Sequence, residues 1–264
     1  MTRLKAVFII SLLTILGLPL ISHAETDSLS AAINKAGKQP MLSQRIAKAY
    51  FFLGENVRPD KAREQLKSSL AMFEKSHQQL KSEIKDKDIQ ELFAFIDIAL
   101  ADYTNLVSQP YDKSSGSEVL DLSETLLEVC QSVVVNLERS STTKKAKLVN
   151  VSGRQRMLSQ RIAKYYVAYQ AGFRDPNSVE QLQKAVQEFE AALKLLSGAK
   201  QNIPEITSAL SKVASLWRVA RKFFLDQKKG GLPVTVFATT DRIMKEMNRI
   251  TNMYEKIIPT ATGQ

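Results

Sequence analysis

Apolar residues recur along most of the chain at alternating spacings of four and three residues. One stretch, for example, carries them at Ile89, Phe93, Ile96, Leu100, Tyr103 and Val107. This spacing places the side chains on one face of an α-helix, and the alternation is typical of helices that pack almost parallel in bundles. No stretch alternates apolar and polar residues as a strand would. The pattern therefore predicts an all-α protein.

Proline, glycine and asparagine gather at intervals between these stretches. These residues begin and end helices, so each cluster predicts a break in the helical structure. We expect about eight helices, because the clusters divide the chain into two sets of four. The breaks are expected at Asn56–Pro59, Lys85–Asp88, Gln109–Gly116, Gly172–Asn177, Ser197–Pro204 and Lys228–Pro233.

One segment occurs twice, letter for letter. The sequence Met-Leu-Ser-Gln-Arg-Ile-Ala-Lys begins at Met41 and again at Met157, 116 residues later. A fixed offset kept over a long stretch indicates a duplicated structural unit. We expect two tandem up-down four-helix bundles, at residues 25–140 and 141–264. Further pairs keep the same offset: Asn34 and Asn150, Gly37 and Gly153, Gln39 and Gln155, and Tyr50 and Tyr166.

The first helix of each unit carries two stripes rather than one. In the second unit, we expect one stripe to face the bundle core, namely Leu158, Ile162, Tyr165 and Tyr169. Arg156 stands two residues before Leu158, which is about 200° around a helix, so it points away from that core. The helix is therefore expected to pack on both sides. The second stripe comprises Val149, Gly153, Arg156, Gln160, Ala163 and Val167, matched in the first unit by Ile33, Gly37, Pro40, Gln44, Ala47 and Phe51.

Arg156 and Gln160 form a polar centre within the second stripe. A guanidinium is a rigid fork of donors that matches a planar oxyanion, and Gln160 adds an amide one turn further on. Nearby Arg154, Arg161 and Lys164 would raise the local positive potential. The alternative is that Arg156 is a solvent-facing arginine on an exposed helix, and the spacing alone does not separate these two interpretations.

Residues 1–24 have the composition of a secretory signal peptide. Arg3 and Lys5 precede an apolar run, and a Ser-His-Ala exit ends at Ala24. This order predicts export with cleavage after Ala24, so the mature protein is expected in the periplasm or outside the cell. The alternative is an uncleaved anchor, but the run is short for a membrane span, which needs roughly 20 residues.

The chain is basic, with 37 Lys and Arg residues against 27 Asp and Glu residues. A basic surface suits anions, nucleic acid or acidic membranes. Export argues against nucleic acid, so we expect no nucleic-acid partner. Most of these charges are expected to solvate helix faces.

Residues that carry catalysis or bind metals are scarce. After the leader, the chain has one histidine, His77, and one cysteine, Cys130, which cannot together make a typical zinc site. His77 takes the stripe position that Leu193 fills in the second unit, and Cys130 lies between apolar positions, so both are expected in the core. We expect no catalytic residue, no metal and no cofactor. Other residues expected as core filling are Tyr103, Trp217, Met244, Met247 and Met253.

The segments 34–45 and 150–161 resemble the signature of the PilJ/NarX-like periplasmic sensor domain. The shared features are a glycine, the Met-Leu-Ser-Gln-Arg run and their spacing on a first helix. The resemblance implies a four-helix bundle of the kind found in type IV pilus chemotaxis transducers and nitrate/nitrite sensor kinases. In the nitrate sensors of this family, the arginine just before the methionine binds nitrate where two first helices meet. The matching residue here is Arg156.

The resemblance assigns a candidate ligand site to the second unit and a degenerate counterpart to the first. At the position of Arg156 the first unit has Pro40, whose side chain cannot bind an anion. A pseudo-dimer of the two first helices would therefore supply one such arginine, whereas a homodimer pairing second units would supply two. The candidate site is Arg156, Gln160, Arg154, Arg161, Gly153 and Met157, and the counterpart is Gly37, Lys38, Pro40, Met41, Gln44 and Arg45.

The resemblance implies a periplasmic sensory protein that binds a small anion such as nitrate or nitrite. Family sensors continue into a second membrane span and a signalling domain, whereas this sequence stops at Gln264. We therefore expect signalling through an envelope or membrane partner. The alternative function is a helical interaction module with no small ligand, which docks through the second stripe of the first helices.

Overall fold

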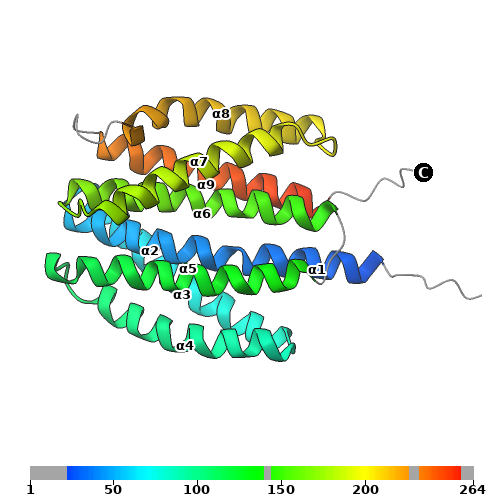
Figure 1. Cartoon of the computed structure of the whole chain (residues 1–264), viewed down its shortest axis with the longest axis horizontal. Helices are drawn as coiled ribbons and strands as arrows, with labels where there is room; N and C mark the ends of the chain where they lie inside the picture. The colour runs from blue at the N-terminus through cyan, green and yellow to red at the C-terminus, as the bar shows by residue number, and fades with distance from the viewer. Residues whose placement is uncertain (1–22, 140–143, 226–231, 257–264) are drawn as a thin grey trace, which may run out of the picture.

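A computed structural model of the chain describes residues 23–139, 144–225 and 232–256, and every regular element within them is helical (Figure 1). The prediction of an all-α protein is confirmed. The first unit contains α1 (His23–Ala36), α2 (Lys38–Gly54), α3 (Pro59–Glu83), α4 (Lys87–Ser108), the short 3-10 helix η1 (Lys113–Ser115) and α5 (Gly116–Arg139). The second contains α6 (Lys144–Gln170), α7 (Pro176–Ser197), α8 (Pro204–Leu225) and α9 (Pro233–Lys256).

The helices begin and end at the clusters of proline, glycine and asparagine in the sequence. Four helices begin at a proline, which lacks an N–H group where the first turn of a helix has no acceptor for one. Asp86 caps α4 by accepting a hydrogen bond from Ile89 N at 3.0 Å, and Asp175 caps α7 by accepting one from Ser178 N at 2.9 Å. The predicted breaks that fall within the described residues are therefore confirmed.

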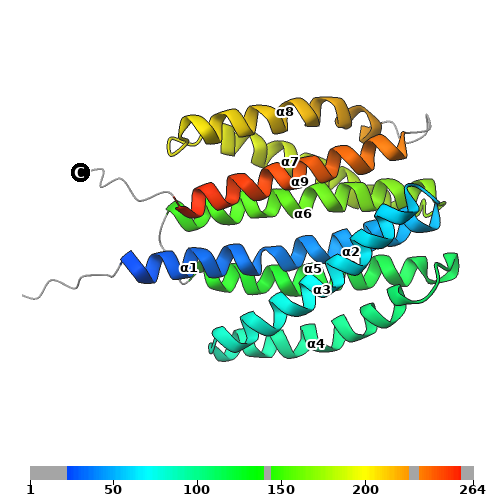
Figure 2. The ribbon, with the colours of Figure 1, turned by 180° about the vertical axis from the view of Figure 1, so that it is seen from behind.

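The first helix of the first unit is divided at Gly37 into α1 and α2. The Gly37 backbone keeps a right-handed helical conformation, and its N–H donates to the Ile33 carbonyl at 2.9 Å. Figures 1 and 2 show the two pieces nearly end to end, so they act as one helix of the bundle. The matching Gly153 lies inside the unbroken α6.

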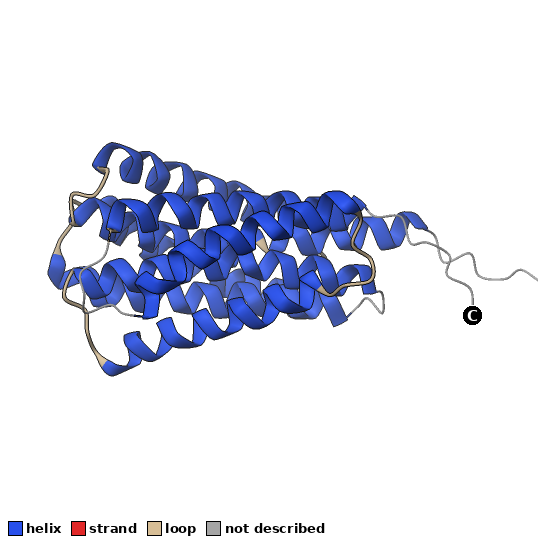
Figure 3. Ribbon diagram, turned by 90° about the horizontal axis from the view of Figure 1, so that it is seen from above, coloured by secondary structure: helices blue, strands red, loops and turns tan. Residues whose placement is uncertain are grey.

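The nine α-helices of the described residues form two four-helix bundles in tandem, as the repeat predicts. One bundle consists of the α1–α2 helix with α3, α4 and α5, and the other consists of α6, α7, α8 and α9. All the long helices follow the long axis of the molecule (Figure 3). The α2 and α6 helices lie side by side at the centre, so the two units meet through their first helices (Figure 2). The α5 and α6 helices are separate and lie in different bundles.

The apolar stripes are buried as expected. His77 is 3% exposed and its Nε2 lies 2.7 Å from Asp97, while the Cys130 thiol is fully buried. Burial raises the pKa of Cys130 far above its ordinary value. Tyr103 and Trp217 are buried, and Met247 is buried between the half-buried Met244 and Met253. The signal-peptide prediction falls almost wholly on residues 1–22, which lie outside the described residues. No helix in the described part of the chain is both long and apolar enough to cross a bilayer.

Candidate functional site

The α6 helix is buried on two opposite faces, which confirms the prediction that it packs on both sides. Leu158 and Ile162 are fully buried in the core of the second unit. Arg156, Gln160 and Ala163 are also fully buried, but on the face that meets the first unit. The interpretation of Arg156 as a solvent-facing residue is therefore wrong, since the other half of the same chain covers it.

The Arg156 guanidinium is held by oxygen atoms from three helices. Nη1 donates to Asn34 Oδ1 of α1 at 2.8 Å and to Asn248 Oδ1 of α9 at 2.9 Å. Nη2 donates to the Asn34 carbonyl at 3.3 Å, and Nε donates to the Gly153 carbonyl at 3.3 Å. All these acceptors are neutral. Arg156 therefore joins the two units by hydrogen bonds, and no described residue provides a neutralising contact.

Two glycines make room for this guanidinium. A Cβ atom at Gly37 would lie 3.2 Å from Arg156 Nη2, and one at Gly153 would lie 3.0 Å from the same atom. Both distances are tighter than ordinary van der Waals contact. The paired glycines of the repeat thus flank the arginine, one from each unit. We call Arg156, Gly37, Gly153, Asn34 and Asn248 the Arg156 site.

The positive charge of Arg156 is buried without a carboxylate in contact among the described residues. Burial lowers its pKa to about 10, and the negative charge of Glu255 partly opposes this shift. Glu255 instead accepts a hydrogen bond from Asn34 Nδ2, which also donates to Asn252 Oδ1 at 3.0 Å. Asn34 therefore stands between the cation and the nearest anion. A buried cation that meets only neutral acceptors favours the approach of an anion.

A groove of about 280 Å³ opens at the surface between α2, α3 and α9, and of the Arg156 site only Asn248 lines it. Asn248, which is half-buried, lines it together with Lys38. Burial and the positive charge of Arg156 both lower the pKa of Lys38. We call it the methionine groove because it is also lined by Met41, Met72 and Met244.

A cluster of charged residues crosses the interface next to the Arg156 site. Lys48 Nζ of α2 lies 2.5 Å from Asp241 Oδ1 of α9, and Arg45 Nη1 lies 3.1 Å from the same oxygen. Gln65 of α3 donates to Asp241 Oδ2 at 2.6 Å. Lys48 also donates to Gln160 Oε1 of α6 at 2.7 Å. The first unit thus supplies the cations and the second unit supplies the acid.

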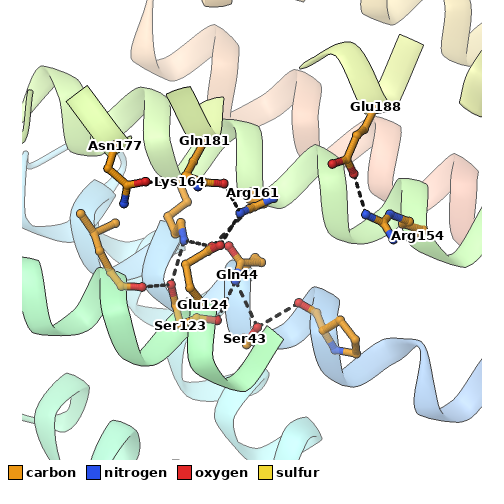
Figure 4. A network of polar contacts seen from close by, with 12 residues as sticks. Ser43, Gln44, Ser123, Glu124, Arg154, Arg161, Lys164, Asn177, Gln181 and Glu188 are labelled. Carbon is orange, nitrogen blue, oxygen red and sulfur yellow. Dashed lines mark hydrogen bonds and ion pairs between the residues drawn. The ribbon is translucent and has the colours of Figure 1, made fainter. Parts of the chain in front are cut away.

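The second unit repeats this cluster with the roles reversed (Figure 4). Lys164 Nζ of α6 lies 2.6 Å from Glu124 Oε1 of α5, and Arg161 donates to both oxygens of that carboxylate. Gln181 of α7 accepts from Arg161 Nη2 at 2.8 Å. Each unit therefore holds an acid of the other through the same Arg-x-x-Lys sequence.

Burial dominates the ionisation of these groups. It lowers the pKa of Lys48 and of Lys164 to about 8, although Asp241 and Glu124 respectively attract the ammonium charges. Burial would raise the pKa of the two acids, but the adjacent lysines and arginines hold both values below their ordinary range. The carboxylates therefore stay charged at neutral pH.

The structure brings together only part of the predicted site. Gly153 and Gly37 contact Arg156, whereas Gln160 lies in the Lys48 cluster. Met157 and Met41 are core residues, Pro40 is buried in α2, and Gln44 donates to the Ser123 carbonyl at 2.8 Å.

Two predicted contributors to the Arg156 site lie elsewhere. Arg154 is exposed and pairs with Glu188 of α7 at 2.7 Å, because two residues along a helix turn it to the outer side (Figure 4). Arg161 is committed to Glu124. The expectation that Arg154, Arg161 and Lys164 add positive potential around Arg156 is corrected accordingly.

Sequence reasoning missed Asn34 and Asn248 as partners of Arg156, and it missed both charged clusters. One signal was present. Lys48 and Lys164 recur at the same place on helices that are expected to be buried on both faces, and buried lysines are almost always paired with an acid. Their acids, Glu124 and Asp241, also hold matching positions in the last helix of each unit.

Comparison with known proteins agrees with the geometry. The family model described as the type IV pili methyl-accepting chemotaxis transducer N-terminal domain, PilJ, matches residues 22–113 and 139–253. The two matched segments fall one in each half of the repeat. No curated protein and no solved structure matches the chain.

Proposed function

The chain belongs to the PilJ family of chemotaxis transducer N-terminal domains, which are sensory domains, and from that premise we propose that it binds a small oxyanion at Arg156. Nitrate and nitrite are the ligands we propose first. The observation that carries the proposal is a fully buried guanidinium, between two units, whose contacts are all neutral. The proposed location is the periplasm, in keeping with the leader sequence.

Electrostatics supports an anionic ligand. Removing a guanidinium from water costs several kcal/mol unless a counter-charge compensates, and here the carboxylate of Glu255 acts at a distance, with Asn34 between it and Arg156. A planar oxyanion can accept two parallel hydrogen bonds from the guanidinium fork. An anion at this place would therefore gain a charge-assisted contact that the asparagine oxygens do not provide.

The ligand would enter through the methionine groove. Asn248 is half-buried there and accepts from Arg156 Nη1, so turning its side chain aside would free this donor. Lys38 lines the same groove and adds a second cation close to the ligand. Gly37 and Gly153 let Nη2 pack directly against both first helices, because a Cβ atom at either position would lie within 3.2 Å of it.

Binding would act on the packing of the two units. Asn34 of α1, Arg156 of α6 and Asn248 of α9 are joined through one guanidinium. A ligand that replaces one of these contacts changes the relation between α1–α2 and α6, which are the helices at the interface. We propose that an envelope or membrane partner detects this change and completes the signalling.

The alternative, an interaction module with no small ligand, gains no support from the second stripe. Arg156, Gln160, Ala163 and Val167 are fully buried against the first unit of the same chain. A docking partner would have to use another face. This pairing supplies one arginine to the site, because the residue of the first unit that matches Arg156 in the repeat is Pro40.

Isothermal calorimetry of the full chain with nitrate, nitrite and chloride at low salt tests the proposal. The informative variant is Arg156→Gln, which removes the charge but keeps polar atoms for Asn34 and Asn248. Arg154→Gln is the matched control, because it lies on the same helix but is exposed on the outer side. Circular dichroism verifies that both variants remain helical.

The proposal predicts saturable binding of nitrate or nitrite that Arg156→Gln abolishes and Arg154→Gln retains. If both variants bound the anion equally well, the binding site would not include Arg156. If no anion released or absorbed heat on titration, the proposal of anion sensing would be contradicted, and the interaction module would be the remaining function.

A further inference from the structure

The two charged clusters each form the floor of a surface groove, and the repeat relates the two grooves to each other. One, of about 490 Å³, lies between α5, α6 and α7 above Glu124 and Arg161. The other, of about 350 Å³, lies between α9, α2 and α3 above Asp241 and Arg45. They are counterparts, because each is bounded by the first two helices of one unit and the last helix of the other.

The grooves differ in the sign of their charge. The groove above Glu124 is lined by Asp121, Glu124, Glu128 and Asp175 against a single cation, Arg161, and we call it the acidic groove. The groove above Asp241 is lined by five basic residues against two acids, and we call it the basic groove. Its charged residues are Arg45, Arg58, Lys61, Arg242, Lys245, Glu64 and Asp241.

Matching positions account for this reversal. Thr125 of α5 corresponds to Arg242 of α9, and Glu128 corresponds to Lys245, at the same offset that relates Glu124 to Asp241. The two units therefore share the floor of the groove but not its rim. Because only one of the two grooves has basic residues at these positions, the packing that both units share does not require them.

The basic rim is free to meet a ligand. Arg58, Lys61, Arg242 and Lys245 are exposed and make no side-chain hydrogen bond or ion pair with another described residue. Asp241 cannot neutralise them, because Lys48, Arg45 and Gln65 already hold its carboxylate. The groove thus carries an excess of positive charge drawn from both units.

The start of α3 adds a further site for an anion. In the acidic groove, the carboxylate of Asp175 caps α7 by accepting from Ser178 N at 2.9 Å. In the basic groove the residue that precedes α3 is Arg58, which has a left-handed backbone (φ 50°) and makes no side-chain cap, although the repeat offset of 116 matches Arg58 to Arg174. Helix N-termini attract carboxylates. A ligand carboxylate can therefore take the place at α3 that Asp175 takes at α7.

Gln65 provides an independent indication of a ligand. It lines the basic groove and is 6% exposed, yet its Oε1 has no hydrogen-bond partner among the described residues. A buried acceptor without a partner is uncommon and costs free energy. A carboxylate cannot donate to it, but the hydroxyl group of a hydroxycarboxylate such as citrate could.

We propose that the basic groove binds a small di- or tricarboxylate, held by Arg58 and Lys61 of the first unit and by Arg242 and Lys245 of the second. The ligand bridges α3 and α9, so it stabilises the arrangement of the two units. The basic groove adjoins the methionine groove, with which it shares Arg45, Ser68 and Lys245, but no residue of the Arg156 site lines it.

Calorimetry of the full chain with citrate, against phosphate and chloride at matched ionic strength, tests the proposal. The informative variant combines Arg242→Thr and Lys245→Glu, which are the residues that the acidic groove has at these positions. The control combines Arg218→Thr and Lys194→Glu, which makes the same change of charge at exposed residues of α8 and α7.

Citrate is expected to bind saturably, and the Arg242→Thr/Lys245→Glu variant should weaken it by at least about tenfold, since two charge-assisted contacts are lost. The control should bind as the unmodified chain does. Tighter binding of phosphate than of citrate would overturn the assignment to carboxylates. An equal loss of citrate affinity in the control would show that the net charge of the protein, and not the basic groove, determines binding. Nitrate binding measured in the single variant Arg242→Thr separates this site from the Arg156 site, because Arg242 lines the basic groove but not the methionine groove, so nitrate binding should be unchanged.

Discussion

Lys48 of the first unit lies 2.5 Å from Asp241 of the second, and the Lys48 side chain is fully buried. Its counterpart Lys164 lies 2.6 Å from Glu124 across the same interface. The duplicated Gln-Arg-Ile-Ala-Lys segment therefore builds the contact between the units twice, once from each side. This explains why these letters are identical in both copies when later helices keep only the apolar pattern.

Removing an acid of these clusters should destabilise the protein. Asp241→Asn leaves Lys48 buried without its counter-charge, and breaking a buried ion pair from one side typically costs roughly 3–5 kcal/mol. Deprotonation of Lys48, whose pKa is about 8, offsets part of this cost. We expect the free energy of unfolding in urea to fall by about 3 kcal/mol.

The matched control is Glu188→Gln, which removes the acid of the exposed Arg154–Glu188 pair. Exposed pairs contribute at most about 1 kcal/mol, so this variant should unfold almost as the unmodified chain does. Equal losses in the two variants would mean that the Asp241 cluster does not hold the units together.

Stability should depend on pH in two separate windows. The folded-state pKa values of Asp241 and Glu124 lie below the unfolded ones, so their contribution is complete above roughly pH 5 and is lost as the pH falls through the folded-state values. Lys48 and Lys164 titrate near 8 when folded and near 10.4 when unfolded. The unfolded chain therefore binds more protons between these values, and stability should rise with pH there.

Denaturation curves measured from pH 7.5 to 10 test the alkaline window. The double variant Lys48→Met/Lys164→Met should lose the rise, whatever its absolute stability. A rise of the same size in that variant would assign the effect to other groups.

Gly116 should not tolerate a side chain. A Cβ atom there would lie 2.2 Å from the ring of Phe173, which packs against Phe51 of α2 at 5.3 Å between ring centroids. Gly116→Ala must displace an aromatic contact between the two units, and we expect a loss of about 2 kcal/mol on thermal or urea unfolding. Gly198→Ala is the control, since the nearest atom to its Cβ would be 3.7 Å away. A stable Gly116→Ala variant would show that Phe173 does not pack at this interface.

Cys130 should report unfolding. Its thiol is fully buried and its pKa is raised, so a maleimide should not react with it in the folded protein. The rate of labelling should increase with urea in parallel with the loss of helicity. Rapid labelling without denaturant would contradict the packing of α5.

The sequence alone indicated the helices from local apolar spacing and the tandem bundles from a repeat at a fixed offset, but it left open whether Arg156 is buried or faces solvent. It could not identify the partners of Arg156, since Asn34 and Asn248 lie 122 and 92 residues away along the chain. It also misplaced Arg154, whose position two residues from Arg156 turns it to the outer side of α6. Contacts between units depend on how α2 and α6 meet, and spacing within one helix does not fix that relation.

Nuclear magnetic resonance of the arginine side chains, in protein labelled with ¹⁵N-arginine and titrated with nitrate, tests the central claim most directly. The guanidinium signals of Arg156 are identified by their loss in Arg156→Gln. We predict that these signals shift saturably with nitrate, while those of Arg154 stay in place. Arg156 signals that remain unchanged at saturating nitrate would contradict the proposed binding of an oxyanion between the two units.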